Sequence, residues 1–438
     1  MITNHGIHQW EIMPGLPDTG GQNVFVNQFS AALADKGFKI TIVNRGGFSH
    51  PTTSELRVGL TYKNDNQRIL FLDDGLAKFV RKEDMGERIP QLFQALLEHF
   101  SKEGMCVDLI ISHYWDGAEL GVLFNSSLHT PVKHIWVPHS LGVVKKRNIN
   151  PLQWSTLRID ERIVNEKKIL LEVDEVTATS AIIRQSLKQD YSYQSSPLFL
   201  PPCVDSKRNR PHTIGNNHSI WTFLSQQSGI SPEEVRKSQI ITEISRTDTT
   251  KRKDILIKAF ARVNKKYPET LLAVTIDKTN GLLTKELMAL IRSLDIEKRI
   301  AVLGSVWGEL PDIYAVTDIY CTPSVMEGFG MTPQEAAATK VPVISSDLVP
   351  FVMEYLLGDE VEEVPYGDET HRLKVGYGAI VVPTDDIAGF ALAMEMLLSR
   401  EAFRRQMGEN AYKTTIPYFT WEDRVRVFLE DSYCRLGL

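Results

Sequence analysis

The sequence is poor in cysteine. Its 438 residues include only four: Cys106, Cys203, Cys321 and Cys434. They are scattered, without the spacing of a metal or redox motif, so we expect reduced, buried thiols and no metal site. The sequence also has no apolar run long enough to span a bilayer, and no recognisable signal peptide. These absences predict a cytoplasmic protein with no transmembrane segment, while association of an amphipathic helix with a lipid surface stays open.

An excess of basic residues is also lacking. Lys and Arg number 49 against 55 Asp and Glu, which gives a formal net charge of −6. This balance leaves no electrostatic footprint for DNA or RNA, so we expect no nucleic-acid partner. Hydrophobic residues make up 42% of the chain, enough for large cores. At about 150 residues per domain, the length predicts two or three domains.

One stretch stands out among what is present. It runs from Glu327 to Glu335, after the apolar run 318–324 and before three alanines. The pattern predicts a strand end, a glycine turn and a helix start, which can offer backbone N–H groups to an anion. The two glutamates lie eight residues apart, so one falls in the loop and the other about one to two helical turns later. One carboxylate could hold a sugar hydroxyl and the other a ribose diol. Chance spacing and a glutamate that merely complements the helix dipole are the alternatives.

A second glycine turn, Asp18-Thr19-Gly20-Gly21-Gln22, lies near the start of the sequence. An amphipathic helix follows, with Val26, Phe29 and Leu33 at helical spacing, and then a strand over 39–44. A glycine loop between a strand and a helix can cradle an anion, although a plain tight turn is the commoner outcome. Residues 1–6 indicate the end of a very short strand, which is either stunted or incomplete at its start.

Polar residues follow two further predicted strands in the first half. The strand over 107–112 ends in His113-Tyr114-Trp115-Asp116-Gly117, and the strand over 133–138 ends in His139-Ser140. Ligands of open α/β sheets collect at such carboxyl ends. Lys145, Lys146 and Arg147 come five to seven residues after Ser140. They could hold a phosphate on an acceptor, or could simply form a solvated loop.

In the second half, the strand over 239–245 ends in a basic loop. Arg246 and Lys251 lie five residues apart, just before a helix that runs through Ile255, Ile257 and Phe260. Two cations before a helix N-terminus suit a diphosphate. An exposed basic loop without a ligand is the alternative.

The string SVMEGFGMTPQEAAATKVPVISS, residues 324–346, closely resembles the nucleotide-binding motif of retaining GT-B glycosyltransferases. This large family includes sucrose-phosphate synthase, sucrose synthase and mannosylfructose-phosphate synthase. The segments Asp-Thr-Gly-Gly-Gln, His-Tyr-x-Asp-Gly, His-Ser-Leu-Gly and Ser-Arg-x-Asp-x-x-Lys resemble the same family. The resemblance covers nearly the whole chain, apart from 206–238 and 357–376.

The resemblance implies an α/β protein of the GT-B fold, with two Rossmann-like domains facing each other across a cleft. The N-terminal acceptor domain would span 1–205, joined by a terminal helix over 420–438, and the nucleotide-sugar domain would span 206–419. We expect an interdomain linker and a variable insertion over 206–238, with a short helix near Ser231. Residues 357–376 are expected to form a loop or insertion with no assigned role.

The family's activity implies a retaining hexosyltransferase. It would move glucose or mannose from a UDP-, GDP- or ADP-linked sugar to a small, phosphorylated acceptor such as fructose 6-phosphate. The departing diphosphate itself can take the acceptor proton. No metal or other cofactor would be required. The resemblance implies no particular oligomeric state.

Residue by residue, the family's functional positions carry over as follows. The catalytic residues would be His139, Arg246, Lys251 and Glu327. The donor-binding residues would be Gly21, Arg246, Lys251, Glu327, Gly328, Phe329, Gly330, Met331, Thr332 and Glu335. The acceptor-binding residues would be Gly20, Gly21, Gln22, Tyr114, Ser140, Lys145 and Arg147. Arg252 stands where the family often has Asn or Gly, which leaves open whether Lys251 or Lys253 is nearer the diphosphate.

Two groups of alternatives remain. One is a transferase of the sucrose synthase type, or one directed at a lipid or glycan. The other is a GT-B nucleotide-sugar epimerase or a nucleotide-sugar-binding scaffold without catalysis. The Asp-Thr-Gly-Gly-Gln and His-Ser-Leu-Gly segments disfavour the epimerase. The presence of every expected site residue disfavours the scaffold.

Overall fold

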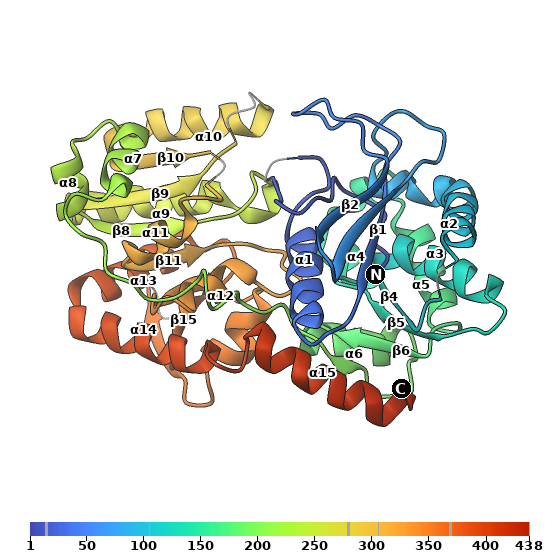
Figure 1. Cartoon of the computed structure of the whole chain (residues 1–438). Helices are drawn as coiled ribbons and strands as arrows, with labels where there is room; N and C mark the ends of the chain where they lie inside the picture. The colour runs from blue at the N-terminus through green and yellow to red at the C-terminus, as the bar shows by residue number, and fades with distance from the viewer. Residues whose placement is uncertain (14–15, 105, 278–280, 305, 368–369, 438) are drawn as a thin grey trace. The chain divides into compact units, whose positions relative to one another are not determined.

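A computed structural model describes residues 1–13, 16–104, 106–277, 281–304, 306–367 and 370–437. The chain forms two compact units. Unit 1 comprises Met1–Pro202 and Trp421–Leu438, and unit 2 comprises Cys203–Thr420. The sequence analysis placed these boundaries at 205/206 and 419/420. Each unit is an α/β layered structure with helices packed around a largely parallel sheet (Figure 1).

Two smaller sheets of unit 1 are joined by a very short strand, which consists of isolated β-bridges made by one residue. Ile2 pairs in parallel with Val43 on one side and Ser112 on the other, which links a three-stranded sheet to a four-stranded sheet. The resulting order is β2-β3-β1-Ile2-β4-β5-β6-β7. The strands are β1 (Ile40–Arg45), β2 (Gly59–Asn64), β3 (Gln67–Leu72), β4 (Leu109–His113), β5 (Lys133–Val137), β6 (Glu175–Ala178) and β7 (Leu198–Phe199).

The helices of unit 1 bury apolar faces against this sheet and against one another. They are α1 (Gly21–Ala34), α2 (Ile89–Glu103), α3 (Tyr114–Ser127), α4 (Gly142–Asn148), α5 (Ile159–Ile169), α6 (Ala181–Asp190) and α15 (Trp421–Leu436). The terminal helix α15 packs on α1: the rings of Trp421 and Phe428 lie 5.6 and 5.3 Å from that of Phe29. This contact holds the C-terminal helix within unit 1.

Unit 2 is built on a sheet of order β10-β9-β8-β11-β12-β15-β14-β13. Its strands are β8 (Gln239–Glu243), β9 (Thr270–Thr275), β10 (Ile300–Leu303), β11 (Ile319–Thr322), β12 (Val343–Ser346), β13 (Glu362–Tyr366), β14 (His371–Val375) and β15 (Ala379–Val382). Its helices are α7 (Ser219–Ser228), α8 (Pro232–Lys237), α9 (Lys253–Lys266), α10 (Leu282–Ser293), α11 (Leu310–Ala315), α12 (Met331–Ala337), α13 (Ile387–Ser399) and α14 (Glu401–Thr415). The central strands are buried on both faces, as parallel strands between helices require.

Two segments that the sequence analysis interpreted as a linker with an insertion and as a loop or insertion are ordered parts of unit 2. Within 357–376, β13 and β14 form an antiparallel pair that extends the sheet. Leu373 and Val375 supply the buried face of this pair, but the many acidic residues hide the alternation. Within 206–238, α7 buries Ile220 and Leu224, so this part is not a linker. The capping box of Ser231 and Glu234 starts α8, where a short helix was expected.

Candidate functional site

In unit 2, the strands β8 and β11 are neighbours, so the loops that follow them meet. Val325 donates a backbone hydrogen bond of 2.8 Å to the carbonyl oxygen of Thr250, which ties the two loops together. Lys251 Nζ then lies 2.6 Å from Glu327 Oε1, and both side chains are mostly buried. The structure therefore brings together the basic loop and the glutamate that the sequence analysis assigned to the same site.

The two lysines that the sequence left as alternatives have different surroundings. Lys253 is 2% exposed, and its ammonium pairs with Glu243 and donates to Ser245 Oγ at 2.9 Å. It is therefore an internal residue. Lys251 is the lysine that borders the loop surface, together with Arg246, which is exposed and has no ion pair among the described residues.

The glycine turn positions the start of α12. Gly330 has a φ of 112°, and a Cβ there would lie 2.7 Å from Val349 Cγ1, so only glycine fits. The Phe329 ring is buried against Phe351 and Phe419. Of the predicted donor-binding residues, Phe329 is thus an internal anchor through its side chain, and only its backbone is left for a ligand.

The rest of this turn has mixed surroundings. Gly328 is exposed, Met331 is half-buried, and Thr332 Oγ1 lies 2.7 Å from the Tyr320 hydroxyl. The same tyrosine hydroxyl donates to the carbonyl oxygen of Ile244 at 3.2 Å. Tyr320 therefore links the start of α12 to the end of β8.

Glu335 lies further along α12, beside Tyr314 of α11. Its side chain is buried and accepts a hydrogen bond of 3.1 Å from the Tyr314 hydroxyl. Burial raises the pKa of Glu335 to about 7, and the hydrogen bond from Tyr314 and the charge of Arg208 oppose this rise. The Arg208 guanidinium stacks 3.9 Å from the centre of the Trp307 ring and donates to the Trp307 carbonyl oxygen.

Sequence reasoning missed Tyr314 and Arg208 as neighbours of Glu335. Arg208 lies in the segment interpreted as a linker, and Tyr314 looks like an ordinary apolar position of α11. Neither residue belongs to a local pattern, so only the fold could reveal them.

In unit 1, the first glycine turn begins α1. The Gly20 N–H donates to Asn23 Oδ1 at 3.0 Å, so this donor is already used. Gly21 and Gln22 are the first two residues of α1, and their N–H groups have no hydrogen bond among the described residues. The Gln22 side chain donates to Thr3 Oγ1 at 3.1 Å, which ties the turn to the short central strand.

His139 follows β5 with a φ of 57°, a conformation that non-glycine residues rarely adopt. Its Nε2 lies 3.0 Å from His113 Nδ1, and its ring contacts Phe25 edge-on at 4.8 Å. Burial, and secondly the charge of His5, lower the pKa of His139 to about 3. His139 is therefore neutral at pH 7.

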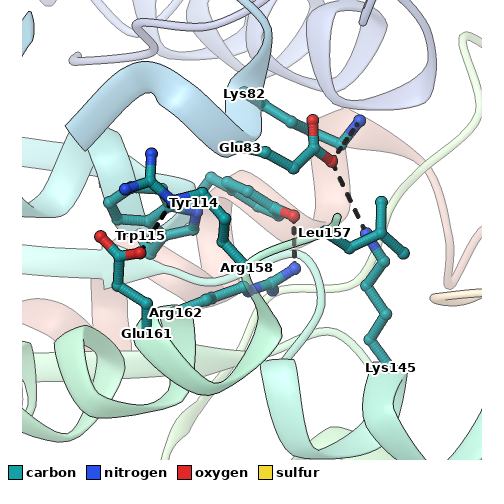
Figure 2. Close-up of a pocket in the computed structure, with 9 residues that line it drawn as sticks. All are labelled: Lys82, Glu83, Tyr114, Trp115, Lys145, Leu157, Arg158, Glu161 and Arg162. Carbon is teal, nitrogen blue, oxygen red and sulfur yellow. Dashed lines mark hydrogen bonds and ion pairs between the residues drawn. The ribbon is translucent and has the colours of Figure 1, made fainter. Parts of the chain in front are cut away.

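Figure 2 shows a pocket of unit 1 that includes Tyr114, the residue directly after β4. It is lined by Lys82, Glu83, Tyr114, Trp115, Lys145, Leu157, Arg158, Glu161 and Arg162. The Arg162 guanidinium faces the Tyr114 hydroxyl and donates to it, and it also donates to Ser140 Oγ at 3.1 Å. Tyr114 and Ser140, both predicted to bind the acceptor, are thus joined by an arginine that the sequence analysis did not single out.

Of the three basic residues after Ser140, only one enters this pocket. They lie on α4, a helix rather than a loop, and Lys145 Nζ lies 3.9 Å from Glu83 Oε1. Arg147 instead pairs with Asp190 and is exposed. Residues two apart on a helix do not share a face. The structure therefore separates Lys145 from Arg147, which the sequence analysis had placed in one phosphate site.

Among the side chains that line this pocket, the cationic ones outnumber the acidic ones. Four cationic and two acidic side chains line it. Burial first, and then the charges of Arg162 and Lys82, lower the pKa of Lys145 to about 8. Lys82 is held by Asp18, the residue that opens the first glycine turn, and Arg162 by Glu166 at 2.7 Å. Arg158 precedes the first residue of α5 and Arg162 lies within this helix, and the sequence analysis singled out neither of them.

The described residues contain neither a metal-ligand cluster nor a membrane-spanning helix. No group of three or more His, Cys, Asp or Glu there is arranged to hold a metal ion. No helix in the same residues has the length and apolar character that crossing a membrane requires.

Two Rossmann-like units, one with a basic loop beside a glycine-turn glutamate, define a GT-B glycosyltransferase. Residues 229–414 match the sequence profile of the family described as "Glycosyl transferases group 1". Residues 19–208 match that described as "Glycosyltransferase Family 4". The chain belongs to the GT-B glycosyltransferases of group 1, and it is a hexosyltransferase that takes its sugar from a nucleotide sugar.

Similar proteins include two kinds of curated relatives. A mannosylfructose-phosphate synthase of Agrobacterium fabrum is 27% identical over 358 residues, which cover 78% of this chain and 75% of the relative. A D-inositol 3-phosphate glycosyltransferase of Nocardia farcinica is 26% identical over 425 residues, which cover 95% of this chain and 85% of the relative. Among solved structures, a sucrose-phosphate synthase from Thermosynechococcus elongatus has a TM-score of 0.78 at 22% identity, covering 99% of this chain and 97% of that one. The last match bears on the fold alone.

Proposed function

We propose that this enzyme transfers glucose or mannose, with retention of configuration, from a nucleoside diphosphate sugar to a small phosphorylated acceptor such as fructose 6-phosphate. The observation that carries the proposal is the pocket of unit 1, whose cationic side chains outnumber its acidic ones. A phosphate offers several acceptor oxygens to such groups, and charge-assisted hydrogen bonds are the strong ones. A phosphorylated cyclitol is a second candidate acceptor, because the relative aligned over 95% of this chain is named for inositol 3-phosphate.

The phosphate would replace protein carboxylates in this pocket. The enclosed space is about 10 Å³, room for roughly one water, so the pocket must open to admit a larger group. The contact of 3.9 Å between Lys145 and Glu83 is the weakest charge pair there and the one a phosphate would displace. The lowered pKa of Lys145 supports this, since a bound anion relieves the repulsion that causes part of the shift.

On the donor, Arg246 and Lys251 would stabilise the negative charge that develops on the departing diphosphate. Glu327 would then accept a hydrogen bond from a sugar hydroxyl, and Glu335 from the ribose. With two cations supplied by the protein, the proposed reaction requires no metal ion. The acceptor oxygen attacks the sugar carbon from the side that the diphosphate leaves, which retains the configuration.

The test is a matrix of donors and acceptors. UDP-, GDP- and ADP-linked glucose and mannose are each incubated with fructose 6-phosphate, fructose, 3-phosphoglycerate, inositol 3-phosphate or no acceptor, and nucleotide release is measured. We expect release that depends on a phosphorylated acceptor and a product with the donor's anomeric configuration by NMR. Equal release with fructose would indicate the sucrose synthase type. No acceptor-dependent release would shift the assignment to a lipid or glycan acceptor.

Lys145 and Arg147 provide a matched pair of variants for the acceptor phosphate. Lys145→Ala should raise KM for the phosphorylated acceptor about tenfold to 100-fold at pH 7, because a hydrogen bond to a charged group contributes about 1.5–3 kcal/mol. Arg147→Ala should change it less than about twofold, since this side chain pairs with Asp190 away from the pocket.

The protonation of Lys145 predicts how KM for the phosphorylated acceptor depends on pH. Its ammonium form predominates below a pKa of about 8 and is lost as the pH rises through that value. KM for the phosphorylated acceptor should therefore rise above pH 8 in the wild type and should not rise there in Lys145→Ala. An equal rise in KM above pH 8 for an unphosphorylated acceptor would contradict the assignment of Lys145 to the phosphate.

A further inference from the structure

A cavity beside the edge strand β2 has no part in the reaction as described. β2 is the outermost strand of the sheet of unit 1 (Figure 1), and the cavity is lined by Thr61 of β2 and by Ile69 and Phe71 of β3. Its volume is about 160 Å³, room for several waters or for a ligand of several non-hydrogen atoms. None of its lining residues lines the pocket of Figure 2, so the two are separate places in unit 1.

Arg57 brings a buried positive charge to this cavity. The residue is 5% exposed, and no described carboxylate forms an ion pair with its guanidinium. Burial, and secondly the charge of Arg45, lower the pKa of Arg57 to about 10, so the side chain stays charged at pH 7. The rings of Phe71 and Phe48, centred 4.5 and 5.0 Å from its Cζ, offset part of the cost of burial. Buried charges are normally paired, because their removal from water is costly.

The hydrogen bonds of Arg57 fix the guanidinium but do not use all of its donors. Nη1 donates to the Arg45 carbonyl oxygen at 3.3 Å, and Nη2 donates to the His8 carbonyl oxygen at 2.8 Å and to Asn44 Oδ1 at 2.7 Å. A guanidinium has more N–H groups than these three bonds use. Its Nε–H has no acceptor among the described residues and is not one of the fully enclosed unpartnered atoms. This donor is therefore available to a ligand.

Two further donors of the lining are enclosed without an acceptor. His50 is 3% exposed, and its Nδ1 accepts hydrogen bonds of 3.2 Å from the backbone N–H groups of Thr52 and Thr53. The proton of the neutral ring therefore lies on Nε2, which has no partner among the described residues. Trp10 Nε1, which can only donate, is enclosed and unpartnered in the same way. Since buried polar groups are normally satisfied, two such donors in one cavity indicate a ligand with acceptor oxygens.

The lining favours a ligand with one negative charge and an apolar body. Arg57 is the one cationic side chain of the lining, and the exposed Glu55 adds a carboxylate. A phosphate monoester carries nearly two negative charges at pH 7, more than this lining balances. A carboxylate carries one, and its two oxygens can accept hydrogen bonds from several donors at once. The apolar part of the wall consists of Leu56, Val58, Ile69 and Phe71.

We propose that this cavity binds the carboxylate group of a small organic acid. Arg57 supplies the charge, and His50 Nε2–H and Trp10 Nε1–H are the additional donors. The apolar wall contacts the body of the acid. This inference does not rest on the proposed sugar transfer, because binding is measured on the full chain without a donor or an acceptor sugar.

The test measures binding of five probes by calorimetry. Acetate, butyrate and benzoate span a range of sizes, butyramide is the uncharged counterpart of butyrate, and inorganic phosphate carries the higher charge. We expect at least one of the three carboxylates to bind with a dissociation constant of about 1 mM or less, the range for a ligand of this size. Butyramide should bind about tenfold more weakly than butyrate, because the charge-assisted hydrogen bond is lost. Phosphate should also bind more weakly than the best carboxylate.

Two conservative variants remove one donor each and leave Arg57 in place. Trp10→Phe keeps an aromatic ring and removes the indole N–H. His50→Asn keeps an acceptor for the N–H groups of Thr52 and Thr53 and removes Nε2–H. Each variant should weaken binding of the best carboxylate about threefold to tenfold, the effect of one hydrogen bond. Lys145→Ala, which removes a cation from the pocket of Figure 2, should bind it as the wild type does.

The possible results either support this site or overturn it. Unchanged affinity in both Trp10→Phe and His50→Asn would overturn it, as would the absence of saturable binding by all three carboxylates. Tighter binding of phosphate than of any carboxylate would overturn the class of ligand. Loss of carboxylate binding in Lys145→Ala would assign the binding to the pocket of Figure 2. None of these results bears on the proposed transfer, which the matrix of donors and acceptors tests separately.

Discussion

Lys251→Ala should lower kcat for sugar transfer about 100-fold to 1,000-fold. Lys251 is the lysine that faces the loop surface, and its ammonium is already oriented by Glu327 at 2.6 Å. A fixed cation in a partly buried position stabilises the charge that grows on the departing diphosphate, and removal of one such group costs about 3–4 kcal/mol. Binding of the intact nucleotide sugar should weaken less, since the charge is largest in the transition state. Steady-state kinetics and calorimetric binding of the donor measure the two effects separately.

The neighbouring Arg252 provides the control. It lies next to Lys251 in the same loop, but its guanidinium pairs with Asp254 and Asp385. Arg252→Ala should therefore change kcat less than about threefold, because partly exposed pairs contribute little. A loss in Arg252→Ala as large as that in Lys251→Ala would assign the effect to the loop's conformation. A kcat within about fivefold of the wild type in Lys251→Ala would remove Lys251 from the catalytic residues.

The sequence predicted strands such as those over 107–112, 133–138 and 239–245 because their apolar runs are continuous and bounded by turn residues, whereas β2 was not predicted. Prediction from the sequence failed for segments that bury only one face or that are fixed by contacts with distant residues. The β13–β14 pair carries so many acidic residues that its alternation is hidden, although Leu373 is fully buried. The short α7 lacks a long apolar stripe and is fixed by packing with the rest of unit 2. Tertiary contacts therefore decided these segments against their local composition.

The candidate site was predictable where it lies in one segment and not where it is assembled from several. Lys251 and Glu327 lie in different segments that the sequence analysis assigned to one site, and the pairing of β8 with β11 explains their contact. Lys145 and Arg147 were grouped because they are close in sequence, but a helix turns their side chains apart. Arg162 has no local motif: its neighbour, Tyr114, is more than 40 residues away. Long-range contacts of this kind leave no signal in a single sequence.

The largest effect on stability is expected at Lys253, two residues from the lysine with the largest effect on catalysis. Its ammonium and the Glu243 carboxylate form an ion pair whose side chains are 1% and 0% exposed. Glu243 Oε1 has no further partner among the described residues. Removal of the ammonium in Lys253→Met would leave a buried, uncompensated carboxylate, which costs about 3–5 kcal/mol. Urea unfolding of the full-length Lys253→Met variant and of the wild type should show this difference in the free energy of unfolding of unit 2.

The double variant Lys253→Met, Glu243→Leu separates charge from shape. It removes both members of the pair, and replacement of a buried pair by apolar residues is often neutral or stabilising. Its stability should therefore return to within about 1–2 kcal/mol of the wild type. If the double variant is as unstable as Lys253→Met, then the hydrogen bonds of Lys253 with Ser245 and Thr275 carry the stability instead. Recovery in the double variant would establish that the contribution of Lys253 to stability is the neutralisation of the buried Glu243 carboxylate.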